Sequence, residues 1–172
     1  ASPEPSFRCT PEAGGEEYDC SQAQHEEMVA KDALYAEAEE VARKLFAENI
    51  RITRAGGATE PPPVLLDLSE RYFLEDVMHR YRDLHDKRLL PRGEDPIIVR
   101  IERLPGRSKE GSVVALRVCV DASNWAFYRG DKLKSRGYLA EDDIYFVRTD
   151  GVLRALGADG RDGCTPLGSS GS

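Results

Sequence analysis

The four cysteines of the chain are Cys9, Cys20, Cys119 and Cys164. Their spacing matches neither the C-x-x-C pattern of metal sites nor a haem attachment site. Cys9 and Cys20 bracket a turn-rich stretch that could not hold its shape by burial, and a bridge there would stabilise it by about 2–4 kcal/mol. Cys119 lies in an apolar strand, whereas Cys164 lies in a polar, Gly-rich tail that needs an anchor. We therefore predict the disulfides Cys9–Cys20 and Cys119–Cys164, with four free thiols as the alternative.

The predicted disulfides indicate the cellular compartment of the protein. Disulfides persist in oxidising environments, so we expect a secreted or extracytoplasmic protein. The opening Ala1-Ser-Pro-Glu-Pro-Ser is polar and Pro-rich, as is typical of the residues left after a signal peptide is removed or after cloning. A lipidated residue upstream of Ala1 would make these residues a membrane tether.

Other groups that could bind a metal are poorly spaced for it. His79 and His85 are six residues apart in a helical pattern, which places them roughly 240° apart around the axis, and His25 is distant in sequence. Asp142 and Asp143 lack the spaced oxygen ligands that calcium requires, so we expect them to be solvated or to form a turn. The sequence predicts no metal site and no cofactor.

Composition limits the class of protein. The chain has 172 residues, of which 40% are apolar, and a formal net charge of −7. This length and apolar fraction suit one packed domain. An acidic balance argues against a nucleic-acid-binding protein, which normally carries a basic stripe.

Two segments have helical periodicity. Ser21 and Gln24 form a capping-box signature, and the apolar spacing behind them predicts a long amphipathic helix that ends before Gly56. Residues 61–63 are prolines, and we expect them to form a stiff connector that is neither helix nor strand. A second helix is predicted from near Asp67 or Ser69 to about Lys87.

Beyond residue 95 the period changes to two, which predicts strands over 96–104, 112–121, 125–129, 143–148 and 152–156. Asp150-Gly151 is a strong hairpin signal. Helices followed by a run of antiparallel strands predict an α+β fold, with the two helices packed against a strongly curved sheet, a cone. We expect a disulfide-tied arm over 1–20, a single domain over 21–164 and a flexible tail over 165–172.

Four segments can be compared with known families: Cys9-Thr-Pro-Glu-Ala-Gly-Gly, Met28-Val-Ala-Lys-Asp-Ala-Leu-Tyr-Ala-Glu-Ala-Glu, Val118-Cys-Val-Asp-Ala-Ser and the final Asp150-Gly151 hairpin. With the order of elements, they resemble the nuclear transport factor 2-like, cystatin-like cone superfamily. In detail they resemble small exported actinobacterial proteins. The likeness covers about residues 20–160, and the superfamily hosts both enzymes and binding modules.

An enzyme with this fold would need an acid or base in the mouth of the cone and a phenol to steady an oxyanion. Asp121 is the candidate base, because it ends an apolar strand, and Tyr128 is a candidate phenol. The alternative is that Asp121 forms the turn into the next strand.

A non-enzymatic cone would instead hold an apolar ligand or the side chain of a protein partner in its mouth. The ligand-binding candidates are Met78, Tyr81, Trp125 and Phe127. We expect such a binding domain at the cell envelope, with no nucleic-acid partner. The alternatives are an isomerase, cyclase or dehydratase, and a scaffold subunit of an envelope secretion or conjugation assembly.

Overall fold

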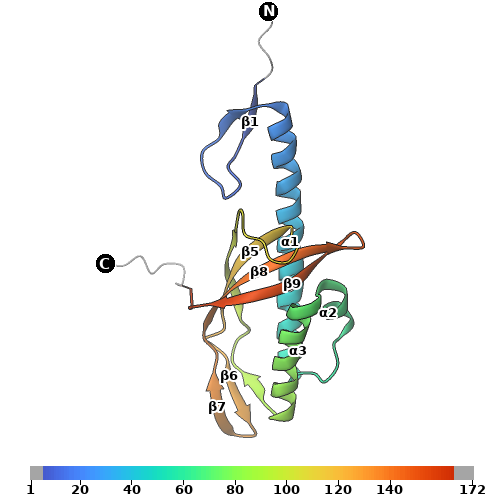
Figure 1. Cartoon of the computed structure of the whole chain (residues 1–172). Coiled ribbons are helices and arrows are strands. Elements are labelled where there is room, and N and C mark those ends of the chain that lie inside the picture. Colours follow the sequence, from blue (N-terminus) through green and yellow to red (C-terminus); the bar gives the residue numbers. More distant parts are fainter. Residues whose placement is uncertain (1–5, 165–172) are drawn as a thin grey trace, which may run out of the picture.

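The computed structural model describes residues 6–164, so the predicted tail over 165–172 and the first five residues of the arm lie outside it. The fold is α+β with a long first helix and antiparallel sheets, as predicted (Figure 1). The elements in chain order are β1 (Phe7–Cys9), β2 (Tyr18–Cys20), α1 (Gln22–Arg54), α2 (Pro63–Leu68), α3 (Arg71–Asp86), β3 (Leu90–Arg92), β4 (Ile97–Arg103), β5 (Val114–Asp121), β6 (Ala126–Arg129), β7 (Lys132–Arg136), β8 (Leu139–Thr149) and β9 (Val152–Arg161).

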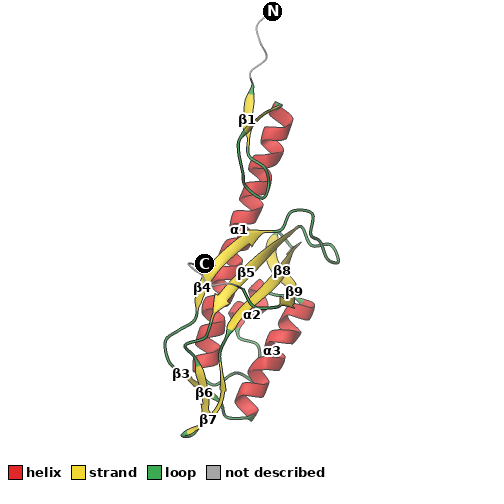
Figure 2. Cartoon of the chain, turned by 90° about the vertical axis from the view of Figure 1, so that its left-hand side faces the viewer, coloured by secondary structure: helices red, strands yellow, loops and turns green. Residues whose placement is uncertain are grey.

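Helix α1 begins at the predicted capping box. The Gln24 backbone N–H donates to Ser21 Oγ at 3.2 Å, and the Ser21 N–H donates to Gln24 Oε1 at 2.9 Å. Its 33 residues span about 50 Å at 1.5 Å per residue. The first buried residue of the helix is Tyr35, so its N-terminal third projects beyond the core, where the β1–β2 hairpin lies beside it (Figure 2).

The second predicted helix corresponds to α3, and a short helix that was not predicted, α2, precedes it. The expectation that residues 61–63 exclude a helix is wrong for Pro63, which is the first residue of α2. A proline fits that position because its missing N–H would have no partner inside the helix. The chain then bends at Ser69, where the backbone is extended, and α3 follows from Arg71.

Four antiparallel strands form the main sheet in the order β4-β5-β8-β9. Strands β8 and β9 are longer than predicted and join through the Asp150-Gly151 turn, with Thr149 paired to Val152. Both turn residues have positive φ, 50° and 78°, as a tight two-residue hairpin requires. The hairpin prediction is confirmed.

The core lies between this sheet and the helices. The predicted alternation of β5 is confirmed, since Val114, Leu116 and Val118 are buried in the same cluster as residues of α1 and α3. At the end of α1, Gly57 has φ +91°, and a Cβ there would lie 2.1 Å from the Tyr81 backbone oxygen. Only glycine allows the chain to pass α3 this closely.

A smaller sheet in the order β3-β6-β7 lies at the end opposite to the arm (Figure 1). Strands β3 and β7 were not predicted, since β3 is three residues long with a central proline and β7 is fully exposed. None of the sheets within residues 6–164 closes or curls strongly, so the cone shape is not confirmed.

Candidate functional site

Both predicted disulfides are present in the structure. Cys9–Cys20 closes the β1–β2 hairpin and Cys119–Cys164 joins β5 to the segment after β9, each with a Cα–Cα distance of 5.9 Å. No cysteine of the chain is free. Each bridge therefore fixes one end of the described chain to a regular element.

The arm is also held to the body by polar contacts. The Tyr35 hydroxyl donates to Glu12 Oε1 at 2.5 Å, and Arg103 Nη1 donates to Asp32 Oδ1 at 2.5 Å. The Arg103 guanidinium carbon also lies 4.7 Å from the centre of the Tyr35 ring. Burial, followed by the hydrogen bond to Glu12, raises the pKa of Tyr35, so the hydroxyl remains a hydrogen-bond donor. These contacts connect the hairpin loop, α1 and the end of β4.

The catalytic candidate Asp121 bonds the residue two positions later. Its Oδ1 accepts hydrogen bonds from the Ser123 backbone N–H at 2.9 Å and from Ser123 Oγ at 2.6 Å. These bonds lower the pKa of Asp121, which makes the carboxylate a weaker base. This geometry is an Asx turn, which agrees with the alternative that Asp121 forms the turn after β5.

The candidate phenol lies in another sheet. Tyr128 is in β6, and the Arg92 guanidinium carbon lies 4.2 Å from the centre of its ring. Asp121 ends β5 in the four-stranded sheet. Their catalytic roles stay predictions, but the structure does not pair Asp121 with Tyr128 through a hydrogen bond within residues 6–164.

Two of the four ligand-binding candidates are core residues. Met78 and Tyr81, both on α3, are each 2% exposed and belong to the main cluster. The Tyr81 hydroxyl donates to Asn49 Oδ1 at 2.7 Å, and burial raises its pKa to about 12. Neither side chain reaches solvent in this structure.

The other two candidates form a separate aromatic pair. The Trp125 and Phe127 rings meet edge to face with centroids 5.7 Å apart. The Arg54 guanidinium carbon lies 5.4 Å from the centre of the Trp125 ring, and the Trp125 indole N–H has no hydrogen-bond partner among residues 6–164. The structure thus separates the four candidates into two places, and their ligand role stays a prediction.

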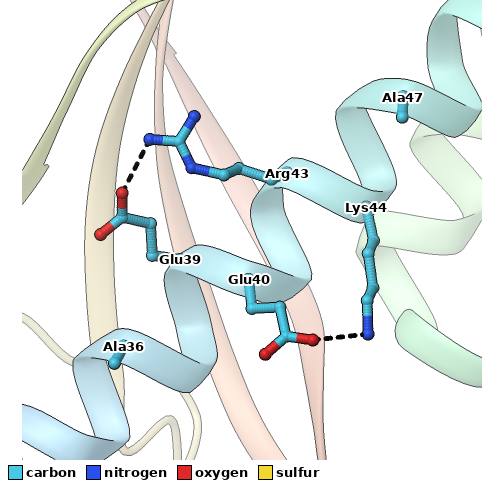
Figure 3. A pocket seen from close by; sticks show the side chains of 6 residues that line it. All are labelled: Ala36, Glu39, Glu40, Arg43, Lys44 and Ala47. Carbon is cyan, nitrogen blue, oxygen red and sulfur yellow. Dashed lines mark hydrogen bonds and ion pairs between the residues drawn. The ribbon is translucent and has the colours of Figure 1, made fainter.

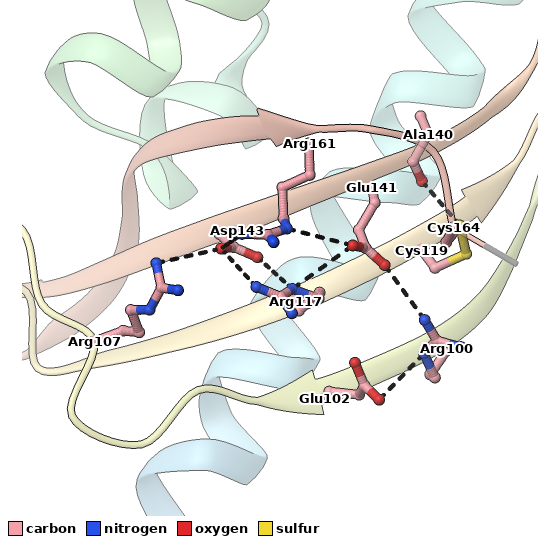
Figure 4. A network of polar contacts seen from close by, with 10 residues as sticks. All are labelled: Arg100, Glu102, Arg107, Arg117, Cys119, Ala140, Glu141, Asp143, Arg161 and Cys164. Carbon is pink, nitrogen blue, oxygen red and sulfur yellow. Dashed lines mark hydrogen bonds and ion pairs between the residues drawn. A yellow bond between two sulfur atoms is a disulfide. The ribbon is translucent and has the colours of Figure 1, made fainter.

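A charged face on the main sheet was not predicted. It covers the side of the sheet opposite to the helices and is built from strands β4, β5, β8 and β9 and the loop after β4 (Figure 4). Its members are Arg100, Glu102, Arg107, Arg117, Glu141, Asp143 and Arg161. The expectation that Asp143 is solvated or in a turn is wrong, because β8 begins at Leu139 and places Asp143 in the middle of a strand.

Asp143 and Asp142 have opposite environments because successive strand residues point to opposite faces. Burial alone would raise the pKa of Asp143, but hydrogen bonds from Arg117 and Arg161 outweigh it and lower the pKa. Asp142 lies on the helix side, where burial raises its pKa, only partly offset by Arg80. The charged face therefore keeps Asp143 ionised as a structural counter-ion.

An open hollow of about 460 Å³ lies on the outer surface of α1 (Figure 3). Ala36 and Ala47 leave the space, and the ion pairs Glu39–Arg43 at 2.8 Å and Glu40–Lys44 at 2.7 Å flank it. Charge pairs four residues apart are typical of a solvated helix face. All residues that line the hollow come from one helix, so it offers no enclosed site.

The ligand atoms of Cys9, Cys20 and His25 lie within 4.8 Å of one another. The two sulfurs bond to each other, and His25 Nδ1 lies 2.9 Å from the Arg8 backbone oxygen. In this oxidised state the cluster offers no thiolate to a metal.

No helix among the described residues is both long and apolar enough to cross a bilayer. Comparisons of the chain with protein-family models, with curated proteins and with solved structures give no match.

Proposed function

We propose that this chain is an extracytoplasmic, non-enzymatic binding domain that acts at the cell envelope, where it contacts a protein partner or an apolar ligand. The observation that carries the proposal is the pair of disulfides at the two ends of the described chain. Both bridges fix segments with little apolar burial of their own. Covalent fixation of this kind is effective only where disulfides persist.

The arm supports a role in binding. It projects from the body, where Tyr18 of the arm is 47% exposed and Val29 of the adjacent helix α1 is 52% exposed. A hairpin that adds little to the core, yet is held by a disulfide, is suited to present a surface rather than to stabilise the fold.

The non-enzymatic part of the proposal is supported by the candidate residues. Asp121 is engaged by Ser123, and its lowered pKa opposes a role as a general base. The hollow on α1 and a second one, of about 370 Å³ between Glu70 and Leu156, contain no histidine or cysteine.

A place in the nuclear transport factor 2-like superfamily, with its cone, remains part of the proposal. The long α1 lying across an antiparallel four-stranded sheet supports it.

The location is tested by labelling intact cells that make the chain with a membrane-impermeant amine reagent. Lys44 and Lys109 are exposed, with 58% and 44% of their side chains accessible, and would be modified before lysis if the domain is extracytoplasmic. A cytosolic protein, labelled in parallel, reports leakage. Labelling of the chain only after lysis would contradict the proposal.

A further inference from the structure

The end of the molecule formed by β3, β6 and β7 is strongly basic, although the chain as a whole carries a net charge of −7. Segments 87–92 and 126–137 hold seven basic residues and one acidic residue, Asp131. We call part of this region the basic tip, which comprises the half-buried Tyr128 and the exposed residues Leu90, Arg92, Arg129, Lys132, Leu133, Lys134 and Arg136. In Figure 1 it lies at the end opposite to the arm.

Most arginines elsewhere in the chain have a carboxylate partner, but the tip cations differ. Within residues 6–164, no carboxylate lies within 4.0 Å of Arg129, Lys132, Lys134 or Arg136. Arg92 reaches Asp131 at 3.3 Å and also lies over the Tyr128 ring. The tip therefore presents uncompensated positive charge to solvent.

Apolar side chains share this surface. Leu90 is paired with Tyr128, and Tyr128 with Leu133, so the three side chains lie in one row on the same face of the small sheet. Leu90 is 51% and Leu133 is 41% exposed. One row along, Arg92 and Arg136 flank Ala126 on that face. Lysines on the edge strand β7 could serve only to prevent its pairing with another chain. That role would not explain why leucines are exposed beside them.

We propose that the basic tip docks onto an anionic lipid surface, with the row of Leu90, Tyr128 and Leu133 entering the interface and the surrounding cations contacting the headgroups. A projecting hairpin with an apolar row and a cationic rim has the composition of an interfacial anchor. Basic side chains attract anionic lipid, and their long stems let the charge remain at the headgroup level. The acidic remainder of the chain would be repelled, which orients the molecule tip first.

This inference names an anionic lipid surface as a partner of the proposed envelope domain. It rests on the proposed function only for the location, the cell envelope, in which the chain would contact that lipid. The test uses the purified oxidised chain and vesicles of phosphatidylcholine and phosphatidylglycerol in a three-to-one ratio, at low salt, with sedimentation as the readout. Binding to pure phosphatidylcholine vesicles should be much weaker. A lack of vesicle binding would contradict the lipid inference but not the proposed extracytoplasmic location. A lack of labelling on intact cells would contradict that location but not the vesicle result.

Variants distinguish a specific contribution of the basic tip to vesicle binding from a general effect of net charge. Lys132→Gln with Lys134→Gln should weaken binding on the order of twentyfold, because each cation near the surface contributes about fivefold. The matched control, Lys31→Gln with Lys44→Gln on α1, makes the same change in net charge and should change binding less than twofold. Leu133→Ser should weaken binding, and Val29→Ser on α1 beside the arm should not. Thermal unfolding of each variant checks that it is folded.

Equal losses in the tip and α1 double variants, or no preference for phosphatidylglycerol, would overturn the inference. Binding of a DNA duplex or of polyglutamate through the same lysines, without vesicle binding, would also overturn it and assign the tip to an acidic polymer.

Discussion

Arg117 on β5 and Asp143 on β8 face each other across the charged side of the sheet as a two-bond ion pair. Arg117 Nε donates to Asp143 Oδ1 at 2.8 Å, and Nη2 donates to Oδ2 at 3.1 Å. The Asp143 side chain is 1% exposed and that of Arg117 is 21% exposed. Arg161 at 3.3 Å and Arg107 at 3.9 Å complete the cationic surroundings of Asp143. On the charged face, ion pairs between neighbouring strands therefore take the place of an apolar layer in stabilising the strand register.

Removing one partner of this pair should cost more than removing both. We expect Arg117→Met to lower the free energy of unfolding by about 2–3 kcal/mol, because it leaves a buried carboxylate with weaker partners. The double variant Arg117→Met with Asp143→Leu should recover most of that loss. Urea denaturation measures both values.

The exposed pair Glu39–Arg43 provides the control. Its side chains are 44% and 56% exposed, so Arg43→Met should cost less than about 1 kcal/mol. A double variant on the charged face that is less stable than Arg117→Met alone would contradict our account of the pair.

Asp142 and Asp143 should respond to pH in opposite directions. The pKa of Asp142 is raised in the folded state, so its contribution favours folding at low pH and is lost as pH rises through that pKa. Asp142→Asn should therefore stabilise the chain at pH 7 by on the order of 1 kcal/mol, or about 2–4 °C. Thermal unfolding across pH measures the difference, which should disappear below the unfolded pKa of about 3.9.

The pKa of Asp143 is lowered in the folded state, so its contribution to stability has the opposite pH dependence. The carboxylate stabilises the fold above the unfolded pKa, and this stabilisation is lost as pH falls through the folded pKa. Asp143→Asn should therefore destabilise the chain at pH 7. Two asparagine variants that shift stability in the same direction would count against the placement of these carboxylates on opposite faces.

The two disulfides should differ in their effect on the body. Cys119–Cys164 spans 45 residues and ties β5 to the end of the main sheet. Replacing both of its cysteines by serine should cost up to about 4 kcal/mol of unfolding free energy. Cys9–Cys20 spans 11 residues of the arm, and its removal should release the hairpin while the unfolding midpoint of the body stays nearly unchanged.

Denaturant unfolding of both double variants, followed by the fluorescence of the single tryptophan, Trp125, measures this difference. The tryptophan directly precedes β6, and the small sheet lies at the end of the molecule opposite to the arm (Figure 1). An equal shift in midpoint for both pairs would show that the arm folds cooperatively with the body.

The Tyr35 hydroxyl should act as the anchor of the arm. Tyr35→Phe removes the hydrogen bond to Glu12 but keeps the ring under Arg103. We expect faster amide exchange over residues 7–20, with a global loss of no more than about 1.5 kcal/mol. Tyr72→Phe, at a residue 49% exposed, is the matched control and should leave the arm unchanged. A uniform increase in exchange over α3 and β5 would instead assign Tyr35 a role in the core.

Local signals in the sequence were sufficient for much of the fold. Ser21 with Gln24, and Asp150 with Gly151, specify a helix start and a hairpin through contacts between near neighbours. The disulfide pairing could be predicted because each end of the chain contains one segment that lacks its own burial. Strand β3 gave no such signal, since it is three residues long with a central proline and forms by pairing with the distant β6.

The charged face and the basic tip depend on register, which the sequence alone does not give. Asp143 meets Arg117 because β5 and β8 pair in a register that places the two residues opposite each other. Leu90 and Leu133 become neighbours of Tyr128 through two separate strand pairings. Interactions of this kind join residues far apart in the chain, so periodicity cannot locate them.

The redox state of the four cysteines in the cells that make the chain tests the central claim most directly. Acid quenching of the cells, followed by denaturation, alkylation with N-ethylmaleimide and mass measurement, counts the free thiols. We predict no alkylated cysteine before reduction and four after reduction, as expected for a domain held by Cys9–Cys20 and Cys119–Cys164. Four alkylated cysteines without reduction would contradict an extracytoplasmic, disulfide-stabilised domain.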